Sequence, residues 1–394
     1  MKYNFDEVID RKNAKRSYST KWDDSARKAR KYGFGETFPE DKICLQTADM
    51  DFKTAPAIIE AMKEVSEHGI YGYSAINNEY RDAVCHWFKT RQDWEFNPED
   101  IMHCNGTHPA LVECIKRFTN KGDGIIVLTP SYSYHDDIES CERTFVGVEM
   151  KEDNGYYSID FEALELALKE SNNTLFVICH PHNPTGRVWN KEELTKMAEL
   201  SRKHNVLMVS DEVHSDIIRK DVTFYPMMKI VGSEGLISLT AVNKTFNLAG
   251  LCCTNMIVQD PKIKEKFAGY YSLPNPFGIA AVIAAYTESE DWVNALNEYI
   301  DETLKWCHHF VSEKMPKAKC IIPEGSYVIW LDLRGYGLSD EQIKHKIINE
   351  AHLVLQGGSN FDSTFGQQFQ RICIPSPRSM IKEAFERLYT VFEK

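Results

Sequence analysis

The chain has 394 residues, 43% of them hydrophobic and 26% charged, which is typical of a globular protein with at least one large core. Its 46 Lys and Arg residues against 58 Asp and Glu residues give a formal net charge of −12, which disfavours a general nucleic-acid-binding surface. No apolar run approaches the roughly 20 residues that a membrane helix needs, and residues 1–15 show no pattern of a targeting peptide. The 11 cysteines are scattered without a C-x-x-C pair, so we expect reduced thiols in a cytoplasmic protein.

The central part of the chain alternates strand-like apolar runs with amphipathic helical stretches. This alternation predicts an α/β fold with a mostly parallel sheet between helices. Several of the strands are almost continuously apolar, as strands buried on both faces are. The predicted strands cover residues 125–129, 144–150, 174–179, 206–210, 235–239 and 254–258. Helices are expected between them, one of them opening at the capping pair Asn190 and Glu193.

After about residue 290 the strict alternation stops. The pattern predicts a long helix over 292–314, strand-like segments over 318–322 and 327–333, a helix over 340–350, and strands near residues 353 and 370. A mixture of this kind indicates a smaller α+β domain. We therefore expect a large domain over residues 51–288 and a small domain over 289–394. The first 50 residues have weak periodicity, and pattern alone does not place them.

The first candidate site segment is Gly106-Thr107-His108, which precedes a predicted helix. A glycine and a hydroxyl at a helix N-terminus can bind an anion through free backbone N–H groups and the helix dipole. The alternative is a purely structural turn in which Thr107 caps its own helix.

Two more segments follow predicted strands, at the sheet edge where open α/β sheets bind ligands. One begins at His180 and contains His182 and Asn183; the other contains Asp211 and His214. Imidazole and carboxylate groups on neighbouring strand ends could bind a metal. However, no H-E-x-x-H motif is present, and Asn183-Pro-Thr-Gly is a turn sequence, so plain turn chemistry is a further alternative.

Lys244 follows the predicted strand 235–239 and precedes an apolar, glycine-containing segment. Partial desolvation would lower the pKa of its amine and allow it to form a Schiff base. The alternative is an ordinary solvated surface lysine.

Taken in order along the chain, these residues resemble the fold-type I enzymes that use pyridoxal 5′-phosphate (PLP). More narrowly, the sequence is similar to the MalY/PatB family of cystathionine β-lyases. The motifs that carry this resemblance are Phe5-Asp-Glu-Val-Ile-Asp-Arg11, Ala48-Asp-Met-Asp-Phe52, Tyr71-Gly-Tyr73, Pro181-His-Asn-Pro-Thr-Gly-Arg-Val-Trp189, Ser210-Asp-Glu-Val-His-Ser-Asp216 and Lys244-Thr-Phe-Asn-Leu-Ala-Gly-Leu251. The resemblance spans nearly the whole chain and implies that residues 1–50 contribute to the small domain.

The resemblance implies roles for the catalytic candidates Lys244, Asp211 and Tyr132. Lys244 would carry PLP and later remove the substrate Cα proton, and Asp211 would keep the ring nitrogen of PLP protonated. Tyr132 would stack on the ring. Asn183 would donate to the phenolate oxygen of PLP, and Arg371 would bind the substrate α-carboxylate with both ends of its guanidinium.

The phosphate of PLP would bind at Gly106, Thr107 and His108, while His214 would lie behind the residues that touch the cofactor. Tyr71 and Tyr73 are both candidates for the tyrosine that reaches the phosphate of a neighbouring subunit, so the resemblance implies a homodimer.

Four positions depart from the wider fold-type I pattern. Cys252 stands where most aminotransferases of this type have a phosphate-binding arginine, an absence that the MalY/PatB group shares. Asn243 stands where serine is usual, and Thr107-His108 replaces the commoner Val-Val. The sequence therefore favours a PLP-dependent C–S β-lyase acting on cystathionine, cysteine or cysteine S-conjugates. The alternatives are an aminotransferase and a catalytically idle, PLP-binding regulatory protein.

Overall fold

The computed structural model describes residues 3–15, 17–132 and 134–394. Its main feature is a seven-stranded sheet in the order β2-β10-β9-β8-β7-β3-β4. Strand β10 runs antiparallel to both of its neighbours, and the remaining pairs are parallel. The strands are β2 (Ile101–Cys104), β3 (Gly124–Thr129), β4 (Thr144–Glu149), β7 (Asn173–Cys179), β8 (Leu207–Asp211), β9 (Leu236–Ala241) and β10 (Thr254–Ile257).

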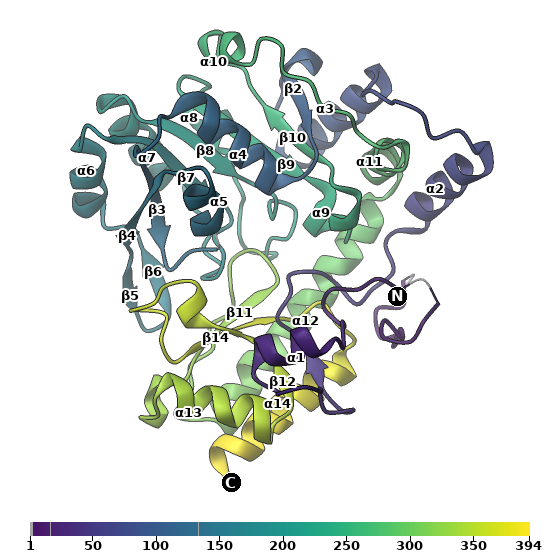
Figure 1. Cartoon of the computed structure of the whole chain (residues 1–394), viewed down its shortest axis with the longest axis vertical. Coiled ribbons are helices and arrows are strands. Elements are labelled where there is room, and N and C mark those ends of the chain that lie inside the picture. The colour runs from purple at the N-terminus through teal and green to yellow at the C-terminus, as the bar shows by residue number, and fades with distance from the viewer. Residues whose placement is uncertain (1–2, 16, 133) are drawn as a thin grey trace.

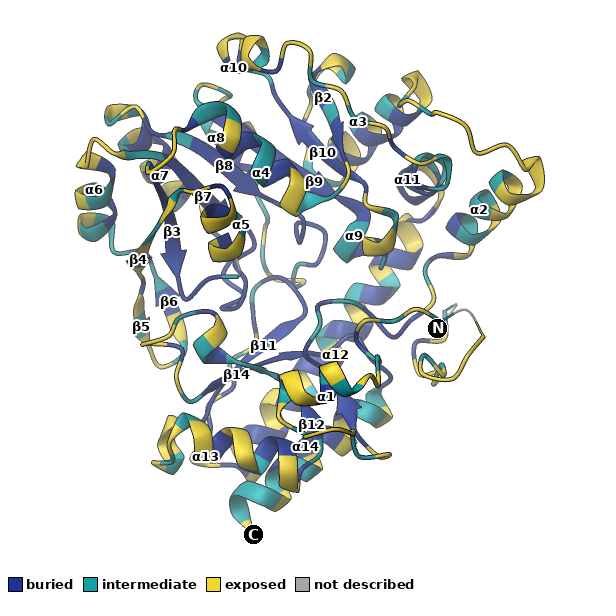
Figure 2. Ribbon diagram, in the orientation of Figure 1, coloured by how far each residue is buried: buried dark blue, intermediate teal, exposed yellow. Residues whose placement is uncertain are grey.

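Helices cover both faces of this sheet, which explains why its inner strands are buried and rich in apolar residues. Every residue of β3 and β9 is buried, whereas the edge strand β4 is largely exposed or half-buried. One face packs against α4 (Thr107–Phe118), α5 (Tyr134–Ser140) and α10 (Pro261–Lys266). The other packs against α6 (Phe161–Lys169), α7 (Lys191–Lys203) and α8 (Met227–Val231). Figure 2 shows the buried sheet between these partly exposed helices.

Three further helices lie on the β2 side of the molecule, with α2 outermost (Figure 1). They are α2 (Pro56–His68), α3 (Asn78–Gln92) and α11 (Pro276–Glu288), and α11 packs against both of the others. The short helix α9 (Val242–Thr245) follows β9 directly. A hairpin of β5 (Lys151–Asp153) and β6 (Tyr156–Ser158) extends the chain beyond β4.

The C-terminal part begins with the long helix α12 (Glu290–Lys314) and contains a three-stranded antiparallel sheet. This sheet has the order β11-β14-β13, made of β11 (Val328–Asp332), β13 (Gln356–Gly357) and β14 (Phe369–Cys373). Helix α13 (Asp340–His345) continues as a π-helical turn to Glu350, and α14 (Arg378–Glu393) ends the chain.

The N-terminal segment lies against this C-terminal part (Figure 1). Strand β1 (Ile43–Cys44) pairs in parallel with β12 (Leu353–Val354), so that Ile43 lies opposite Leu353, 310 residues later in the chain. The short helix α1 (Ala26–Tyr32) precedes β1 and ends at Gly33, whose φ of 89° is the left-handed cap that favours glycine.

Six predicted strands and the predicted α/β fold are confirmed, as is the capping box of Asn190 and Glu193 that opens α7. The prediction of a strand-like segment over 318–322 is wrong. Only Lys319 forms an isolated bridge there, to Asp332, so the segment lacks the continuous hydrogen-bonded partner that a strand requires. The described residues include no helix long and apolar enough to cross a bilayer.

Candidate active site

The C-terminal ends of the parallel strands meet at one edge of the large sheet, facing the C-terminal part of the molecule (Figure 1). A cavity of about 360 Å³ opens at this edge. It is lined by eight of the residues that the sequence singled out. They are Gly106, Thr107, His108, Tyr132, Asn183, Asp211, His214 and Lys244.

Lys244 lies on α9 because β9 ends at Ala241 and the chain turns into a helix at once. Its ammonium donates a hydrogen bond to the backbone oxygen of Ala48, at 3.0 Å, and has no carboxylate partner among the described residues. Burial and, to a smaller extent, the charge of Arg371 lower the pKa of Lys244. The solvated-surface alternative for this lysine is therefore wrong.

Asp211 is the last residue of β8, and its carboxylate is buried. It accepts a hydrogen bond from the Tyr134 hydroxyl at 2.8 Å and from the backbone N–H of Val213 at 3.4 Å. Burial raises the pKa of Asp211, and no cation pairs with it in the described part of the chain. The carboxylate thus favours a positively charged group placed beside it in the cavity.

The N-terminus of α4 forms one end of the cavity. Gly106 caps this helix with a φ of 117°, a conformation that a side chain would strain. The Thr107 hydroxyl lies 3.1 Å from that of Thr254. Because the first-turn N–H groups of a helix have no intrahelical acceptor, this end of the cavity suits an anion.

His108 connects two sides of the cavity wall. Its Nδ1 makes a close contact with the Asp137 carboxylate, and its Nε2 lies 3.2 Å from the Tyr132 hydroxyl. The hydrogen bond with Asp137 raises the pKa of His108. A protonated His108 would add positive charge beside the anion-binding end of the cavity.

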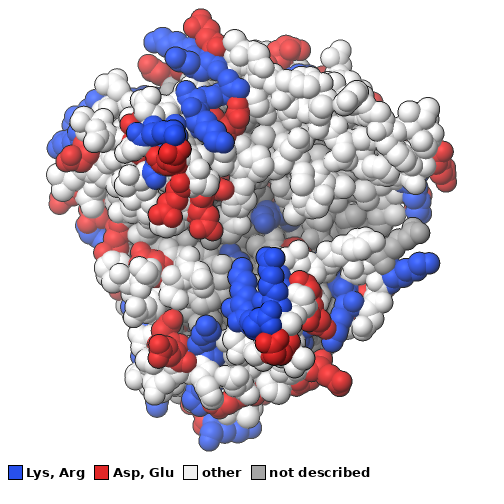
Figure 3. Space-filling view, viewed as in Figure 1, with Lys and Arg blue, Asp and Glu red and all other residues white. Residues whose placement is uncertain are grey.

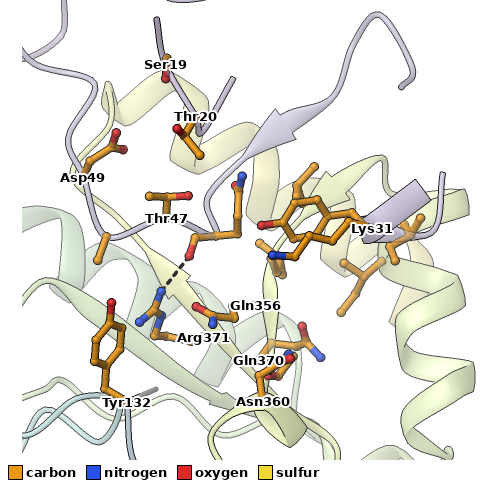
Figure 4. A pocket seen from close by; sticks show the side chains of 18 of the residues that line it. Ser19, Thr20, Lys31, Thr47, Asp49, Tyr132, Gln356, Asn360, Gln370 and Arg371 are labelled. Carbon is orange, nitrogen blue, oxygen red and sulfur yellow. Dashed lines mark hydrogen bonds between the residues drawn. The ribbon is translucent and has the colours of Figure 1, made fainter. Parts of the chain in front are cut away.

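Arg371, on β14, is only 2% exposed and faces the strand ends from the C-terminal part. It donates to the backbone oxygen of Gln46 at 2.7 Å, the bond dashed in Figure 4, and to Oδ1 of Asn183 at 3.3 Å. Its Nε has no hydrogen-bond partner, and the described residues provide no carboxylate for it. A buried guanidinium without a counter-charge is suited to bind an anion from outside the chain.

A second, larger cavity of about 1030 Å³ adjoins the first and is lined by Arg371. Tyr132 and Lys244 line both cavities, so a molecule in the larger one reaches the amine of Lys244. Figure 3 shows a hollow between the upper and lower parts of the molecule at this place.

His214 is buried, with its Nδ1 3.0 Å from the Ser326 hydroxyl. Burial, followed by the charges of Lys244 and Arg371, holds the pKa of His214 well below its usual value, so the ring is neutral. It contacts the ring of Tyr327 edge-on, at 5.5 Å between centroids.

Tyr71 and Tyr73 do not reach the cavity of their own chain. Both lie on the exposed segment between α2 and α3, and Tyr73 is 96% exposed. The Tyr71 ring packs against Phe277, 5.4 Å away between centroids.

The histidines considered as metal ligands are occupied in other ways. His180 donates from Nε2 to the backbone oxygen of Tyr225 at 3.0 Å, and His182 lies 2.9 Å from the Thr185 hydroxyl. Burial lowers the pKa of His180 to about 4 and that of His182 to about 3. Within the described ranges, no three His, Cys, Asp or Glu side chains are placed to share an ion.

Sequence reasoning missed three groups that hold the site together: Tyr134, Asp137 and Ser326. Tyr134 and Asp137 lie just after the expected Tyr132, on the first turns of α5, and their spacing could have drawn attention to them. Ser326 comes from the other part of the chain, so no local signal links it to His214.

Comparisons with known proteins agree with this arrangement. The family described as aminotransferase class I and II matches residues 40–388. The chain is 35% identical to cystathionine β-lyase PatB of Bacillus subtilis, over 94% of this chain and 95% of that protein. It is 28% identical to protein MalY of Escherichia coli, over 97% and 96% of the two chains.

Among solved structures, cystalysin from Treponema denticola, which contains a pyridoxal 5′-phosphate cofactor, superposes with a TM-score of 0.93. The two chains are 32% identical, and 99% of each is covered. The fold, the strand-end residues and these relatives together show that the chain belongs to the class I and II aminotransferases and, within them, to the MalY/PatB group.

Proposed function

We propose that the protein is a PLP-dependent C–S β-lyase that converts cystathionine, cysteine or cysteine S-conjugates to a thiol, pyruvate and ammonia. One observation carries this proposal. A half-buried amine, a buried carboxylate without a cation and a buried guanidinium without an anion open on connected cavities, in a chain 35% identical to a cystathionine β-lyase.

The residues of the smaller cavity fit PLP. Asp211 supplies the carboxylate that a pyridinium nitrogen requires, and Asn183 supplies an amide for the phenolate oxygen. The first turn of α4, with Thr107 and His108, supplies donors and positive charge for the phosphate. When bound, PLP draws electrons from the substrate and so weakens its Cα–H bond.

Lys244 is the residue that moves the proton. Burial lowers the pKa of Lys244, which favours the neutral amine that can take the Cα proton onto Nζ. Arg371 holds the substrate α-carboxylate and so fixes which Cα bond points toward the cofactor. Loss of the β-sulfur as a thiol then distinguishes elimination from amino transfer.

Cys252 favours elimination over the aminotransferase alternative. It lines the smaller cavity at the position where the wider family has a phosphate-binding arginine, and its φ of 55° places it in a left-handed turn. Because a thiol cannot supply the positive charge of an arginine, the phosphate would depend chiefly on the N-terminus of α4.

We further propose that the active protein is a homodimer. Ile70, Tyr71, Tyr73, Tyr271 and Leu273 expose large apolar side chains, and the contact of Tyr71 with Phe277 joins the two segments that carry them. Exposed aromatic surface of this kind marks an interface. A second copy would bring Tyr71 or Tyr73 to the neighbouring phosphate site. Sedimentation of the holoenzyme at twice the chain mass supports this; a monomer with full activity contradicts it.

Two further proposals concern organisation and location. The pairing of β1 with β12 supports a small domain formed by residues 1–50 and 289–394, with residues 51–288 as the PLP-binding domain. All 11 cysteines are free thiols, most of them buried, which supports a cytoplasmic protein.

The function is tested by incubating the PLP-loaded protein with L-cystathionine and measuring homocysteine and pyruvate. We expect both products in equal amounts, and none from the Lys244→Ala variant. Failure of the wild-type protein to release either product from cystathionine, cysteine or S-alkyl cysteines would refute the proposal.

A further inference from the structure

The larger cavity extends well beyond what a cysteine side chain needs. At about 1030 Å³ it lies at the upper end of the roughly 300–1,000 Å³ that drug-sized ligands occupy. Arg371 and Lys244 lie where it meets the smaller cavity, so the remaining volume is left for the group attached to the substrate sulfur.

Two lysines line this outer volume without an ion-pair partner in the described part of the chain. They are Lys31, near the end of α1, and Lys344, on α13. A Cβ added at Gly33 would lie 3.7 Å from Cε of Lys344 and 3.5 Å from Cδ1 of Ile348, so α13 packs on the end of α1. Both lysines therefore belong to one rim, where Figure 3 shows basic side chains gathered below the hollow.

Two of the four carboxylates in the same wall are committed to other groups. Asp49 pairs with Arg11 at 2.9 Å, and Asp340 accepts from the Ser359 hydroxyl and from the backbone N–H of Gln368. The others are exposed: Asp136 on α5 and Glu341 on α13. The two lysines are thus available to a ligand.

Neutral hydrogen-bonding groups fill the space between Arg371 and Lys31. Gln356 on β13 is the pairing partner of Arg371 on β14. Gln370 and Asn360 line the same cavity (Figure 4). Apolar side chains that suit methylene groups line the same cavity, namely Ile347, Ile348, Val354 and Leu355. The wall therefore suits a short aliphatic chain that ends in an anionic group.

We propose that this outer volume is a subsite for a carboxylate at the end of the sulfur substituent, and that Lys31 and Lys344 determine specificity for it. The inference rests on the proposed lyase function and names its substrate class: cysteine thioethers whose leaving thiol bears a carboxylate. Exposed pairs of this kind contribute roughly 0.2–1 kcal/mol each, or about 1.4-fold to 5-fold in affinity.

The test compares two substrates of equal length, S-(2-carboxyethyl)-L-cysteine and S-propyl-L-cysteine, by thiol release. For the Lys31→Met, Lys344→Met double variant we expect kcat/KM on the carboxylate substrate to fall about 2-fold to 25-fold, mainly through KM and by more than on the propyl substrate. On the propyl substrate it should stay within twofold. Raising the ionic strength should also lower the ratio of kcat/KM on the carboxylate substrate to kcat/KM on the propyl substrate in the wild-type protein, because salt screens the lysine charges.

Lys28→Met is the matched control, because Lys28 lies on the same helix but does not line the cavity. It should leave both substrates unchanged. Equal losses on the two substrates, no loss on either, or the same selective loss in the control would overturn the subsite. Absence of thiol from both substrates in the wild-type protein would instead overturn the lyase function on which the subsite rests.

Discussion

Replacing Arg371 tests whether this residue binds the substrate carboxylate or only stabilises the fold. In the free protein this guanidinium is buried, donates to the Gln46 backbone oxygen at 2.7 Å and to Asn183 at 3.3 Å, and leaves Nε without a partner. If it binds the substrate carboxylate, removing it leaves that carboxylate unpaired inside the site. The cost is about 2–5 kcal/mol of transition-state binding, or roughly 30-fold to several-thousand-fold in kcat/KM.

Two variants make the prediction sharper. Arg371→Met should show the full loss, and Arg371→Lys an intermediate loss, because an ammonium cannot bind both carboxylate oxygens at once. The free energy of unfolding of Arg371→Met should change by no more than about 1 kcal/mol, because relief from burying an unpaired charge offsets the two hydrogen bonds that Arg371 donates.

The assay is steady-state thiol release, with thermal denaturation of each variant in parallel. A kcat/KM within threefold of wild type in Arg371→Met would refute the reasoning. A loss of activity that simply follows a loss of folded protein would do the same, since it would assign Arg371 to the fold.

Three other variants test the rest of the site. Lys244→Ala should abolish turnover. It should also abolish the stable PLP label that borohydride reduction leaves on the wild-type protein, and peptide mapping should locate that label at Lys244. A label on a different lysine in the wild-type protein would contradict the assignment. Asp211→Asn should keep PLP bound, by absorbance, but lower kcat by roughly two to four orders of magnitude, because the partner of the ring nitrogen is no longer charged; undiminished turnover would remove Asp211 from the mechanism. Glu212 is buried, and burial raises its pKa from 4.5 to about 8, so between these values the folded protein retains a proton that the unfolded chain has lost. The free energy of unfolding should therefore fall as pH rises from about 5 to 8, and Glu212→Gln should flatten this decline in denaturant titrations; identical slopes would show that Glu212 is not the cause.

The parts of the fold that could be predicted are those that local sequence specifies. Strands such as β3 and β9 are buried on both faces, so their apolar runs mark them even without knowledge of their neighbours. Strand β2 was not predicted, because His103 interrupts its short apolar run. Residues 318–322 have strand-like composition, but pairing is a tertiary property, and only Lys319 finds a partner.

The candidate site follows the same division. Asp211 and Lys244 follow or end predicted strands, so topology alone brings them to one edge of the sheet. The acceptor of the Lys244 amine is a backbone oxygen of Ala48, and the partner of His214 is Ser326. Both contacts depend on how the N-terminal segment and the C-terminal part lie against the large sheet, which no pattern in the sequence specifies.

The most direct test of the account follows both possible fates of one substrate in a single experiment. The PLP-loaded protein is given L-cystathionine together with a keto-acid acceptor, and pyruvate and the amino acid formed from the acceptor are measured together. We predict pyruvate and homocysteine in equal amounts, with amino transfer a small fraction of turnover. Efficient amino transfer with negligible pyruvate would contradict it and would identify the protein as an aminotransferase.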